Sequence, residues 1–254
     1  MNFIVIIPSR YESTRFPGKP LADIGGKMMI QRVYEQASKA IEEVWVATDD
    51  ERIVDAVKSF GGNVVMTSKA HRSGTDRCAE AVLKASEITG KTYDVVINVQ
   101  GDEPFMQPHE IELITECFID SPGTEIATLI QPILKNEDIF RPDMVKVILD
   151  KEQNATFFSR SPIPHIFGVD ESKWLENYPF YGHVGLYAYR NDVLQKLAKL
   201  TEGLLEKVES LEQLRWLENG FKIKTNVTDS DNFGIDTPED LALAIAGGIE
   251  KYYI

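Results

Sequence analysis

Short apolar runs alternate with longer helical patterns along the first part of this chain, and this alternation most restricts how it can fold. Nearly continuous Val and Ile, as in Asp94–Val99, are typical of a strand that is buried on both faces of a parallel sheet. We therefore predict an α/β fold with a doubly wound, mixed but mostly parallel sheet. The expected elements are the strands Phe3–Ile7, Val44–Ala47, Val64–Met66 and Asp94–Val99 and the helices Met29–Ala40, Glu51–Phe60 and Thr75–Thr89.

The pattern loosens after Gln131, where strands and loops replace the repeat of strand and helix. We interpret the chain as a single domain, 1–254, in which about 131–220 form a smaller subdomain and 221–254 return to the core of about 1–130. The elements expected in this part are the strands Val145–Leu149, Gly185–Tyr189 and Lys222–Val227, the helix Ser210–Asn219, and a closing helix after Asp236-Thr237-Pro238.

The charge of the chain excludes several classes of partner. Its 254 residues carry 27 Lys and Arg against 40 Asp and Glu, a formal net charge of −13 at pH 7. Proteins that bind nucleic acid or anionic membranes by bulk attraction need a broad basic surface to neutralise phosphates, so we expect neither partner. A phosphate ligand must therefore meet a local basic cluster. Two short segments provide one, since 1–20 and 69–77 each hold three bases and one acid.

The cysteines and apolar runs favour a cytoplasmic protein. Cys78 and Cys117 form no CxxC pair, so neither a zinc site nor a disulfide framework is predicted. The first apolar run has about five residues, fewer than the roughly 7–15 of a signal-peptide core. No apolar stretch approaches the roughly 18–20 residues of a membrane span.

A basic loop follows the first predicted strand, from Pro8 to Pro20. Loops that leave the carboxyl ends of parallel strands are where open α/β sheets bind ligands. Arg10, Arg15 and Lys19 fall within ten residues of one another. Arginine grips phosphate oxygens bidentately and lysine acts as a mobile point charge, so the loop suits a triphosphate, although a solvated basic loop explains the same composition. It matches neither a Walker A loop nor a GxGxxG turn.

A carboxylate follows the strand Asp94–Val99, in the sequence Gln100-Gly101-Asp102. An acid on a tight glycine turn at this position is well placed to hold a hard cation beside a phosphate, and Mg²⁺ needs only one or two carboxylates in addition to phosphate oxygens. Asp236 is the candidate second ligand. The residues after it, Thr237 to Asp240, also read as a helix cap with a capping box, and both interpretations can hold together.

Two further sets of polar residues are weaker signals. In 71–77, Ser73 or Thr75 is explained most simply as a helix cap, although free N–H groups at a helix start also favour anions. No spacing rule joins the remaining candidates, and the four histidines show no metal-binding spacing. These candidates are Arg160, His183, Tyr187, Glu212 and Gln213.

Six motifs, in order along nearly the whole chain, closely resemble those of the 3-deoxy-manno-octulosonate (Kdo) cytidylyltransferases, or CMP-Kdo synthetases. The motifs are the loop from Ile6 to Leu21, Ala47-Thr48-Asp49, the segment from His71 to Arg77, Val99-Gln100-Gly101-Asp102-Glu103-Pro104, Phe158-Ser159-Arg160 and Asp236-Thr237-Pro238-Glu239-Asp240-Leu241.

The resemblance implies a Rossmann-like fold of the nucleotide-diphospho-sugar transferase type, with a smaller subdomain for substrate binding and dimerisation. It further implies a Mg²⁺-dependent cytoplasmic homodimer that transfers CMP from CTP to the anomeric hydroxyl of Kdo. The reaction releases pyrophosphate and supplies an activated sugar for lipopolysaccharide assembly. On this basis 1–130 would bind the nucleotide and 131–220 the sugar acid.

The resemblance also assigns roles to individual residues. The catalytic residues would be Arg10, Lys19, Asp102 and Asp236, the last two as Mg²⁺ ligands. The nucleotide would be bound by Pro8, Arg10, Arg15, Lys19, Ser73, Thr75 and Arg77. The sugar-acid pocket would be lined by Gln100, Arg160, His183, Tyr187, Glu212 and Gln213, with Arg160 facing the carboxylate of Kdo.

Two alternatives stay open on the sequence alone. A cytidylyltransferase for another keto-sugar acid, such as 8-amino-Kdo or sialic acid, would use the same phosphate chemistry. A non-catalytic nucleotide-binding protein could keep the fold without the reaction. The intact basic loop and both carboxylates count against the second alternative.

Overall fold

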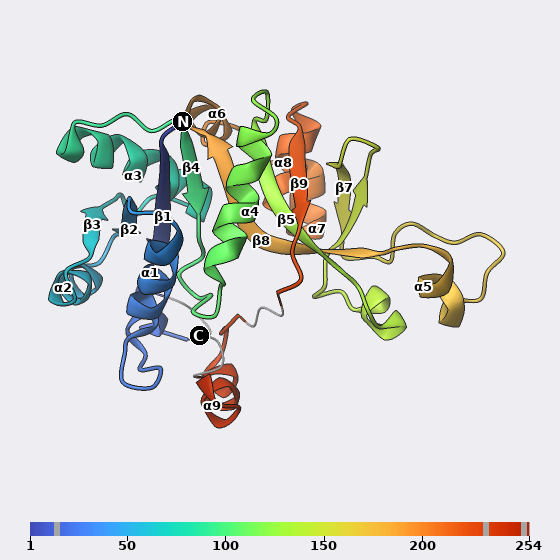
Figure 1. The fold of residues 1–254 in the computed structure, drawn as a ribbon, viewed down its shortest axis with the longest axis horizontal. Coiled ribbons are helices and arrows are strands. Elements are labelled where there is room, and N and C mark those ends of the chain that lie inside the picture. The colour runs from blue at the N-terminus through green and yellow to red at the C-terminus, as the bar shows by residue number, and fades with distance from the viewer. Residues whose placement is uncertain (13–15, 231–233, 250–252, 254) are drawn as a thin grey trace. The chain divides into compact units, whose positions relative to one another are not determined.

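The computed structural model describes residues 1–12, 16–230, 234–249 and 253 (Figure 1). Within it the chain forms two compact units. The first comprises 1–112, 189–198 and 231–254, and the second comprises 113–188 and 199–230. These boundaries differ from the predicted ones near 130 and 220, because the chain leaves the first unit earlier and returns to it twice.

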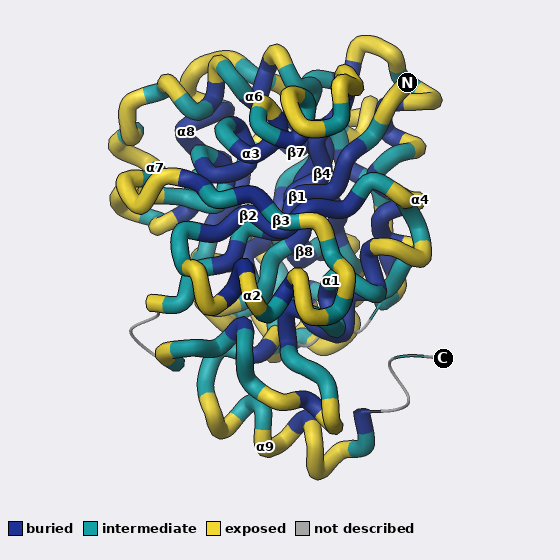
Figure 2. Tube along the Cα trace, turned by 90° about the vertical axis from the view of Figure 1, so that its left-hand side faces the viewer, coloured by how far each residue is buried: buried dark blue, intermediate teal, exposed yellow. Residues whose placement is uncertain are grey.

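The first unit is built on parallel strands in the order β3-β2-β1-β4. Val5 of β1 lies opposite Val44 of β2 on one side and Ile97 of β4 on the other. β2 and β4 are buried along their whole length, as Figure 2 shows, which explains their continuous apolar sequences. The strands are β1 (Phe3–Ser9), β2 (Val44–Thr48), β3 (Asn63–Met66) and β4 (Val95–Asn98).

Helices α1, α2 and α3 pack against these strands. Side-chain caps fix where several helices begin: Asp50 accepts from the backbone of α2, Ser73 from that of α3, and Thr237 forms the predicted capping box with Asp240. Gly90 ends α3 in the left-handed conformation, with φ 70°. The helices are η1 (Lys19–Leu21, 3₁₀), α1 (Met29–Ala40), α2 (Glu51–Ser59), α3 (Gly74–Thr89), α6 (Asn191–Leu197) and α9 (Pro238–Ala246); α4 (Pro108–Ile119) crosses the boundary at 112.

The second unit has mixed strand pairing. β5 and β9 are parallel, whereas β6 pairs antiparallel with β7 and β8, and β7 pairs antiparallel with β9. Its strands are β5 (Ile126–Pro132), β6 (Lys146–Leu149), β7 (Asn154–Ser159), β9 (Ile223–Val227) and β8 (Tyr181–Arg190), the last of which crosses the boundary after 188. Its helices are η2 (Asn136–Phe140), η3 (Glu171–Lys173), α5 (Trp174–Asn177), α7 (Leu204–Glu209) and α8 (Glu212–Glu218).

Each unit buries apolar clusters of its own. In the first, Ile24, Met29 and Phe105 pack with Ile235 and thereby hold the C-terminal segment against the strand-end loops. In the second, the rings of Trp174 and Phe180 stack with centroids 6.1 Å apart. Packing of this kind fixes the loops that carry polar side chains.

The predicted α/β class with mixed strand pairing is confirmed. Among the residues that the structure describes, no helix is long and apolar enough to cross a membrane.

Candidate functional site

The carboxyl ends of β1 and β4 open into a pocket of about 230 Å³. Since the two strands are parallel neighbours, the loops that follow them leave the sheet at the same edge. The predicted site residues that line this pocket are Pro8, Arg10, Lys19, Gln100, Asp102 and Asp236. Ser9 and Glu12 line it as well, and sequence reasoning did not assign them to the site.

Gly101 allows the two loops to approach each other. A Cβ atom at this position would lie 2.5 Å from Oγ of Ser9 and 2.9 Å from the carbonyl oxygen of Pro8. The second of these contacts is with backbone, which cannot turn aside as a flexible side chain can. A glycine is therefore required where the loop after β4 meets the end of β1.

Lys19 links the two predicted metal carboxylates. Its Nζ lies 2.6 Å from Oδ2 of Asp102 and 3.4 Å from Oδ1 of Asp236, and it donates to the carbonyl oxygen of Ile235 at 3.0 Å. The Lys19 side chain is only 11% exposed, so these interactions are partly shielded from water. Two carboxylates from distant parts of the sequence thus converge on a single cation.

The position of Asp236 depends on the start of α9. The N–H groups of Asp236 and Thr237 donate to Oδ2 of Asp240 at 3.0 and 2.8 Å, and the N–H of Ile235 donates to the carbonyl of Asp102 at 3.1 Å. The capping interpretation and the ligand interpretation of this segment are therefore compatible: the cap fixes the backbone while the Asp236 side chain faces Lys19.

This geometry fits a hard divalent cation. Within the described ranges no group of three or more His, Cys, Asp or Glu side chains could hold a metal ion. Mg²⁺ does not need such a group, because it retains waters and takes phosphate oxygens beside one or two carboxylates. Burial, followed by the charges of Asp102, Glu110 and Asp236, raises the pKa of Glu103 to about 8.

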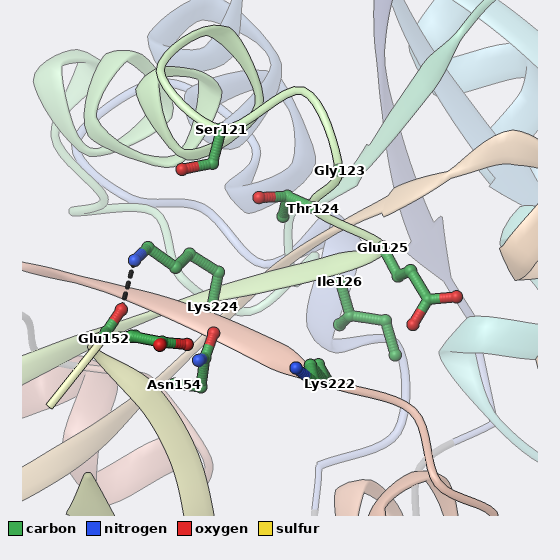
Figure 3. A pocket seen from close by; sticks show the side chains of 9 residues that line it. All are labelled: Ser121, Gly123, Thr124, Glu125, Ile126, Glu152, Asn154, Lys222 and Lys224. Carbon is green, nitrogen blue, oxygen red and sulfur yellow. Dashed lines mark hydrogen bonds between the residues drawn. The ribbon is translucent and has the colours of Figure 1, made fainter. Parts of the chain in front are cut away.

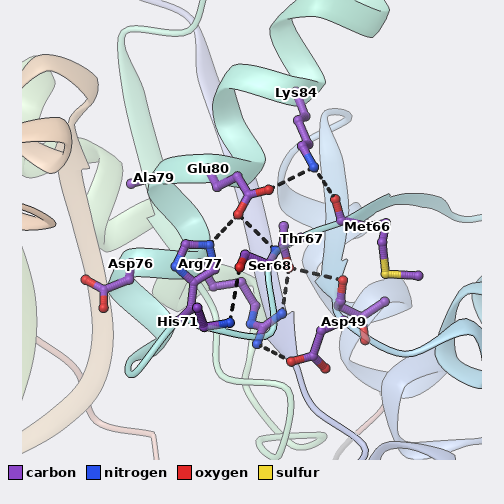
Figure 4. A network of polar contacts seen from close by, with 12 residues as sticks. Asp49, Met66, Thr67, Ser68, His71, Asp76, Arg77, Ala79, Glu80 and Lys84 are labelled. Atoms are coloured by element: carbon purple, nitrogen blue, oxygen red, sulfur yellow. Dashed lines mark hydrogen bonds and ion pairs between the residues drawn. The ribbon is translucent and has the colours of Figure 1, made fainter.

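The segment 71–77 does not line the pocket. Ser73 caps α3, accepting from the N–H of Asp76 at 3.1 Å, and Thr75 is buried in the first turn. Arg77 is also buried, and its guanidinium donates to Oγ1 of Thr67 at 2.6 Å and to Oδ2 of Asp49 at 2.8 Å (Figure 4). Ser73, Thr75 and Arg77 were predicted to contact the nucleotide, but none of them lines this pocket. Arg15, another predicted contact, lies outside the described residues.

A second cluster of predicted residues lies within the second unit. His183 and Tyr187, four residues apart on β8, have ring centroids 5.2 Å apart, and Tyr187 meets the ring of Trp216 edge-on at 5.1 Å. Gln213 lies one turn before Trp216 on α8 and is 4% exposed. Nε2 of His183 and Nε2 of Gln213 are buried with no hydrogen-bond partner in the described protein. An unpaired buried polar atom costs about 1–3 kcal/mol, so this cluster is suited to a polar ligand.

Arg160 and Glu212 are held by neighbours in the second unit. The Arg160 guanidinium donates to the carbonyl oxygens of Glu209 at 2.7 Å, Pro142 at 3.0 Å and Ser210 at 3.4 Å, so its direction is fixed by backbone. Glu212 accepts from Arg215 at 2.5 Å. All three acceptors of the guanidinium are carbonyl oxygens, which suits a side chain that would pair with an organic acid.

A larger pocket lies elsewhere in the second unit. It has a volume of about 460 Å³ and contains none of the predicted residues (Figure 3). Lys222 and Lys224 line it together with Glu125 and Glu152, and Lys224 donates to the carbonyl of Glu152. These opposite charges cancel, so the pocket offers no net attraction to a phosphate or a carboxylate.

Comparison with known proteins agrees with this chemistry. A family model described as cytidylyltransferase matches residues 4–223. The chain belongs to the cytidylyltransferase family. Within the family it is 56% identical to a 3-deoxy-manno-octulosonate cytidylyltransferase of Parabacteroides distasonis, over 97% of this chain and 98% of the relative. A relative of the same name from Phocaeicola vulgatus is 54% identical over 97% of each chain.

A solved structure extends the similarity to the fold of this cytidylyltransferase. It is a CMP:2-keto-3-deoxy-manno-octonic acid synthetase complexed with CTP, with a TM-score of 0.89 and 41% identity, and the match covers 99% of this chain and 100% of the other. An 8-amino-3,8-dideoxy-manno-octulosonate cytidylyltransferase from Shewanella piezotolerans is 48% identical over 97% of this chain and 98% of the relative.

The environment of His183 predicts how the stability of this cytidylyltransferase depends on pH. Burial lowers the pKa of His183 from 6.5 to about 4, so the folded protein keeps the imidazole neutral where the unfolded chain takes up a proton. Stability should therefore fall as pH falls from 6.5, by about 1.4 kcal/mol per pH unit at most. Denaturant unfolding at pH 6.5 and 5 should show a smaller loss in His183→Gln than in the parent. The control His165→Gln, at an exposed site, should lose as much as the parent. Equal losses in all three proteins would contradict the assignment.

Proposed function

We propose that this protein transfers CMP from CTP to the anomeric hydroxyl of Kdo, giving CMP-Kdo and pyrophosphate. The observation that carries the proposal is the convergence of Arg10, Lys19, Asp102 and Asp236 on one pocket at the ends of β1 and β4. The near full-length similarity to enzymes that are named for this reaction supports the choice of nucleotide and sugar.

The reaction is an in-line displacement at the α-phosphorus of CTP. The anomeric oxygen forms the new bond to phosphorus, the bond from the α-phosphorus to the bridging oxygen breaks, and pyrophosphate leaves while the hydroxyl proton passes to solvent. Arg10 and Lys19 hold phosphate oxygens and spread the charge that develops on them. We assign no side chain as general base, because positioning and electrostatic stabilisation supply most of the rate enhancement in such a transfer.

Mg²⁺ is part of the proposal, with Asp102 and Asp236 as the residues that would hold it. When bound, the ion would withdraw charge from the phosphate oxygens. The approach of Lys19 to both carboxylates supports the assignment, because the pair already accommodates one cation. With the metal present, Lys19 would be released to meet the nucleotide.

The second unit is proposed to bind the sugar acid. Arg160, fixed by three carbonyls, would pair with the Kdo carboxylate, and the unpaired Nε2 atoms of His183 and Gln213 would bond to sugar hydroxyls. Tyr187 and Glu212 lie beside them. Gln100, the remaining predicted sugar contact, lines the pocket of the first unit.

Three further properties are proposed from the family resemblance. The strand order β3-β2-β1-β4 supports a doubly wound sheet in the first unit. Cys78 and Cys117 are buried and form no disulfide, which supports a reducing, cytoplasmic location. A homodimer is what the resemblance implies, with the smaller unit providing the dimer surface.

The substrate can be tested by measuring pyrophosphate release. With CTP, Mg²⁺ and Kdo we expect turnover that falls at least about 100-fold when UTP or ATP replaces CTP, a typical discrimination for a site that hydrogen-bonds its substrate. Equal or faster turnover with 8-amino-Kdo would assign the protein to the reaction of the Shewanella relative, and activity only with sialic acid would refute Kdo. CTP binding without turnover on any sugar acid would indicate a non-catalytic protein.

Replacement of Asp102 tests the metal site. Asp102→Asn should lower kcat at least about 100-fold while leaving the melting temperature nearly unchanged, because the amide keeps the size of the side chain but removes its charge. Asp55→Asn, on the exposed face of α2, is the matched control and should retain full activity. Near-normal Mg²⁺-dependent turnover of the Asp102 variant would rule out the assignment.

Replacement of Arg160 tests the sugar-acid site. Arg160→Ala should raise the KM for Kdo by about tenfold or more, the value of a charge-assisted hydrogen bond, with the KM for CTP changed less than twofold. Lys151→Ala removes an exposed positive charge from the same unit and should change neither constant. If Arg160→Ala raised the KM for CTP and left that for Kdo unchanged, Arg160 would have been misplaced.

A further inference from the structure

We propose that Glu80, on α3, is a positioning residue that sets the direction of the Arg10 guanidinium through His71. The inference rests on the proposed function, in which Arg10 holds the triphosphate. Glu80 does not line the 230 Å³ pocket, whereas Arg10 does. Any effect of Glu80 on the nucleotide must therefore pass through other residues.

Glu80 fixes the loop between β3 and α3 at two points. Its Oε2 accepts from the backbone N–H of Ser68 at 3.0 Å and pairs with Nε2 of His71 (Figure 4). Its other oxygen, Oε1, lies 2.8 Å from Nζ of Lys84. Burial raises the pKa of Glu80, but the bonds from Lys84, Ser68 and His71 outweigh that effect and lower it to about 2, so the side chain is a carboxylate at any physiological pH.

The neighbours of Glu80 on the helix hold the same loop. Arg77, Glu80 and Lys84 are spaced three and four residues apart, so their side chains leave one face of α3. Arg77 bonds to Oγ1 of Thr67, and Lys84 donates to the carbonyl of Met66 at 2.7 Å. The segment 66–71 is thus anchored from its first residue to its last by one helix.

His71, the last residue of this segment, connects it to the pocket. The carbonyl oxygen of His71 accepts from Nη2 of Arg10. A free arginine side chain has many rotamers, and confining it costs conformational entropy. Glu80 holds the His71 carbonyl in place, and this carbonyl holds the Arg10 side chain. Much of the entropy cost of confining Arg10 therefore falls on folding and not on ligand binding. The remaining N–H groups of the guanidinium are then directed to a ligand before it arrives.

The role also explains why Arg77 belongs to the motif 71–77 although it is buried. A direct phosphate ligand needs an accessible guanidinium, but the Arg77 side chain is 1% exposed and pairs with Asp49. Its contribution lies in anchoring the start of the loop that Glu80 and His71 complete.

The test is a double-mutant cycle on CTP binding, measured by calorimetry with the full-length protein and Mg²⁺. We expect Glu80→Ala to weaken CTP binding about five- to tenfold and Glu80→Gln, which still accepts from Ser68, about two- to threefold. In an Arg10→Ala background, Glu80→Ala should weaken binding less than twofold, because the residue it orients is gone. Glu87→Gln, at an exposed site on the same helix, should have no effect.

Equal weakening by Glu80→Ala in both backgrounds would show a merely structural role and overturn the proposal. If Glu80→Ala fails to fold, His71→Ala replaces it, since this change removes the ring but keeps the carbonyl, and the same coupling to Arg10 is expected. If the protein binds CTP but does not transfer CMP to Kdo, the proposed function is refuted. The double-mutant cycle on CTP binding still tests the role of Glu80 in that case. If the parent binds no CTP, crystal structures decide: the bond from Arg10 to His71 must be present in the parent and absent in the Glu80 variant.

Discussion

The parallel pairing of β1 with β2 and β4 is the constraint on which the first unit depends. Parallel neighbours point the same way, so the loops that follow β1, β2, β3 and β4 all leave the sheet at one edge. The polar side chains of the site follow these strands in turn: Arg10 after β1, Asp49 after β2, His71 after β3 and Asp102 after β4. A single hydrogen-bonding pattern therefore brings together residues that lie far apart in the sequence.

The charges that line the pocket at this edge of the sheet bear on how a protein with a net negative charge could bind an anion. The pocket offers Arg10 and Lys19 to an anion, but Lys19 is held by Asp102 and Asp236, and Glu12 lines the pocket as well, so the site carries no net positive charge. A free anion would meet little net attraction there. A divalent cation that arrived with the anion would offset the negative charge of the carboxylates. For the proposed function, this distribution of charge would favour the metal complex of the nucleotide over the free nucleotide.

Much of the architecture was predictable because its signals are local. The helix α1 begins and ends where its amphipathic pattern does, at Met29 and Ala40, and the capping box at Thr237 was readable from four residues. The helix α4 was missed although Pro108 stands at its first position and Ile111, Ile114 and Phe118 follow at helical spacing. The strand β7 was missed because it begins with polar residues and is short.

The parts of the site that resisted prediction depend on contacts between distant residues. An arginine in a motif looks the same in the sequence whether it meets a ligand or, as Arg77 does, a partly buried carboxylate of the protein itself. The pairing of Asp236 with Lys19 likewise depends on how the C-terminal segment packs against Ile24 and Phe105, which no local pattern encodes.

The close approach at Gly101 determines how a substitution of this residue would affect ligand binding. The residue has no side chain with which to touch a substrate, yet it separates Ser9 and Pro8 from the turn that carries Asp102. One added methyl group would push apart the loop that is proposed to hold phosphate and the loop that is proposed to hold the metal. Such a substitution would weaken the binding of the nucleotide and the binding of the metal ion at the same time, although the added atom would contact neither of them.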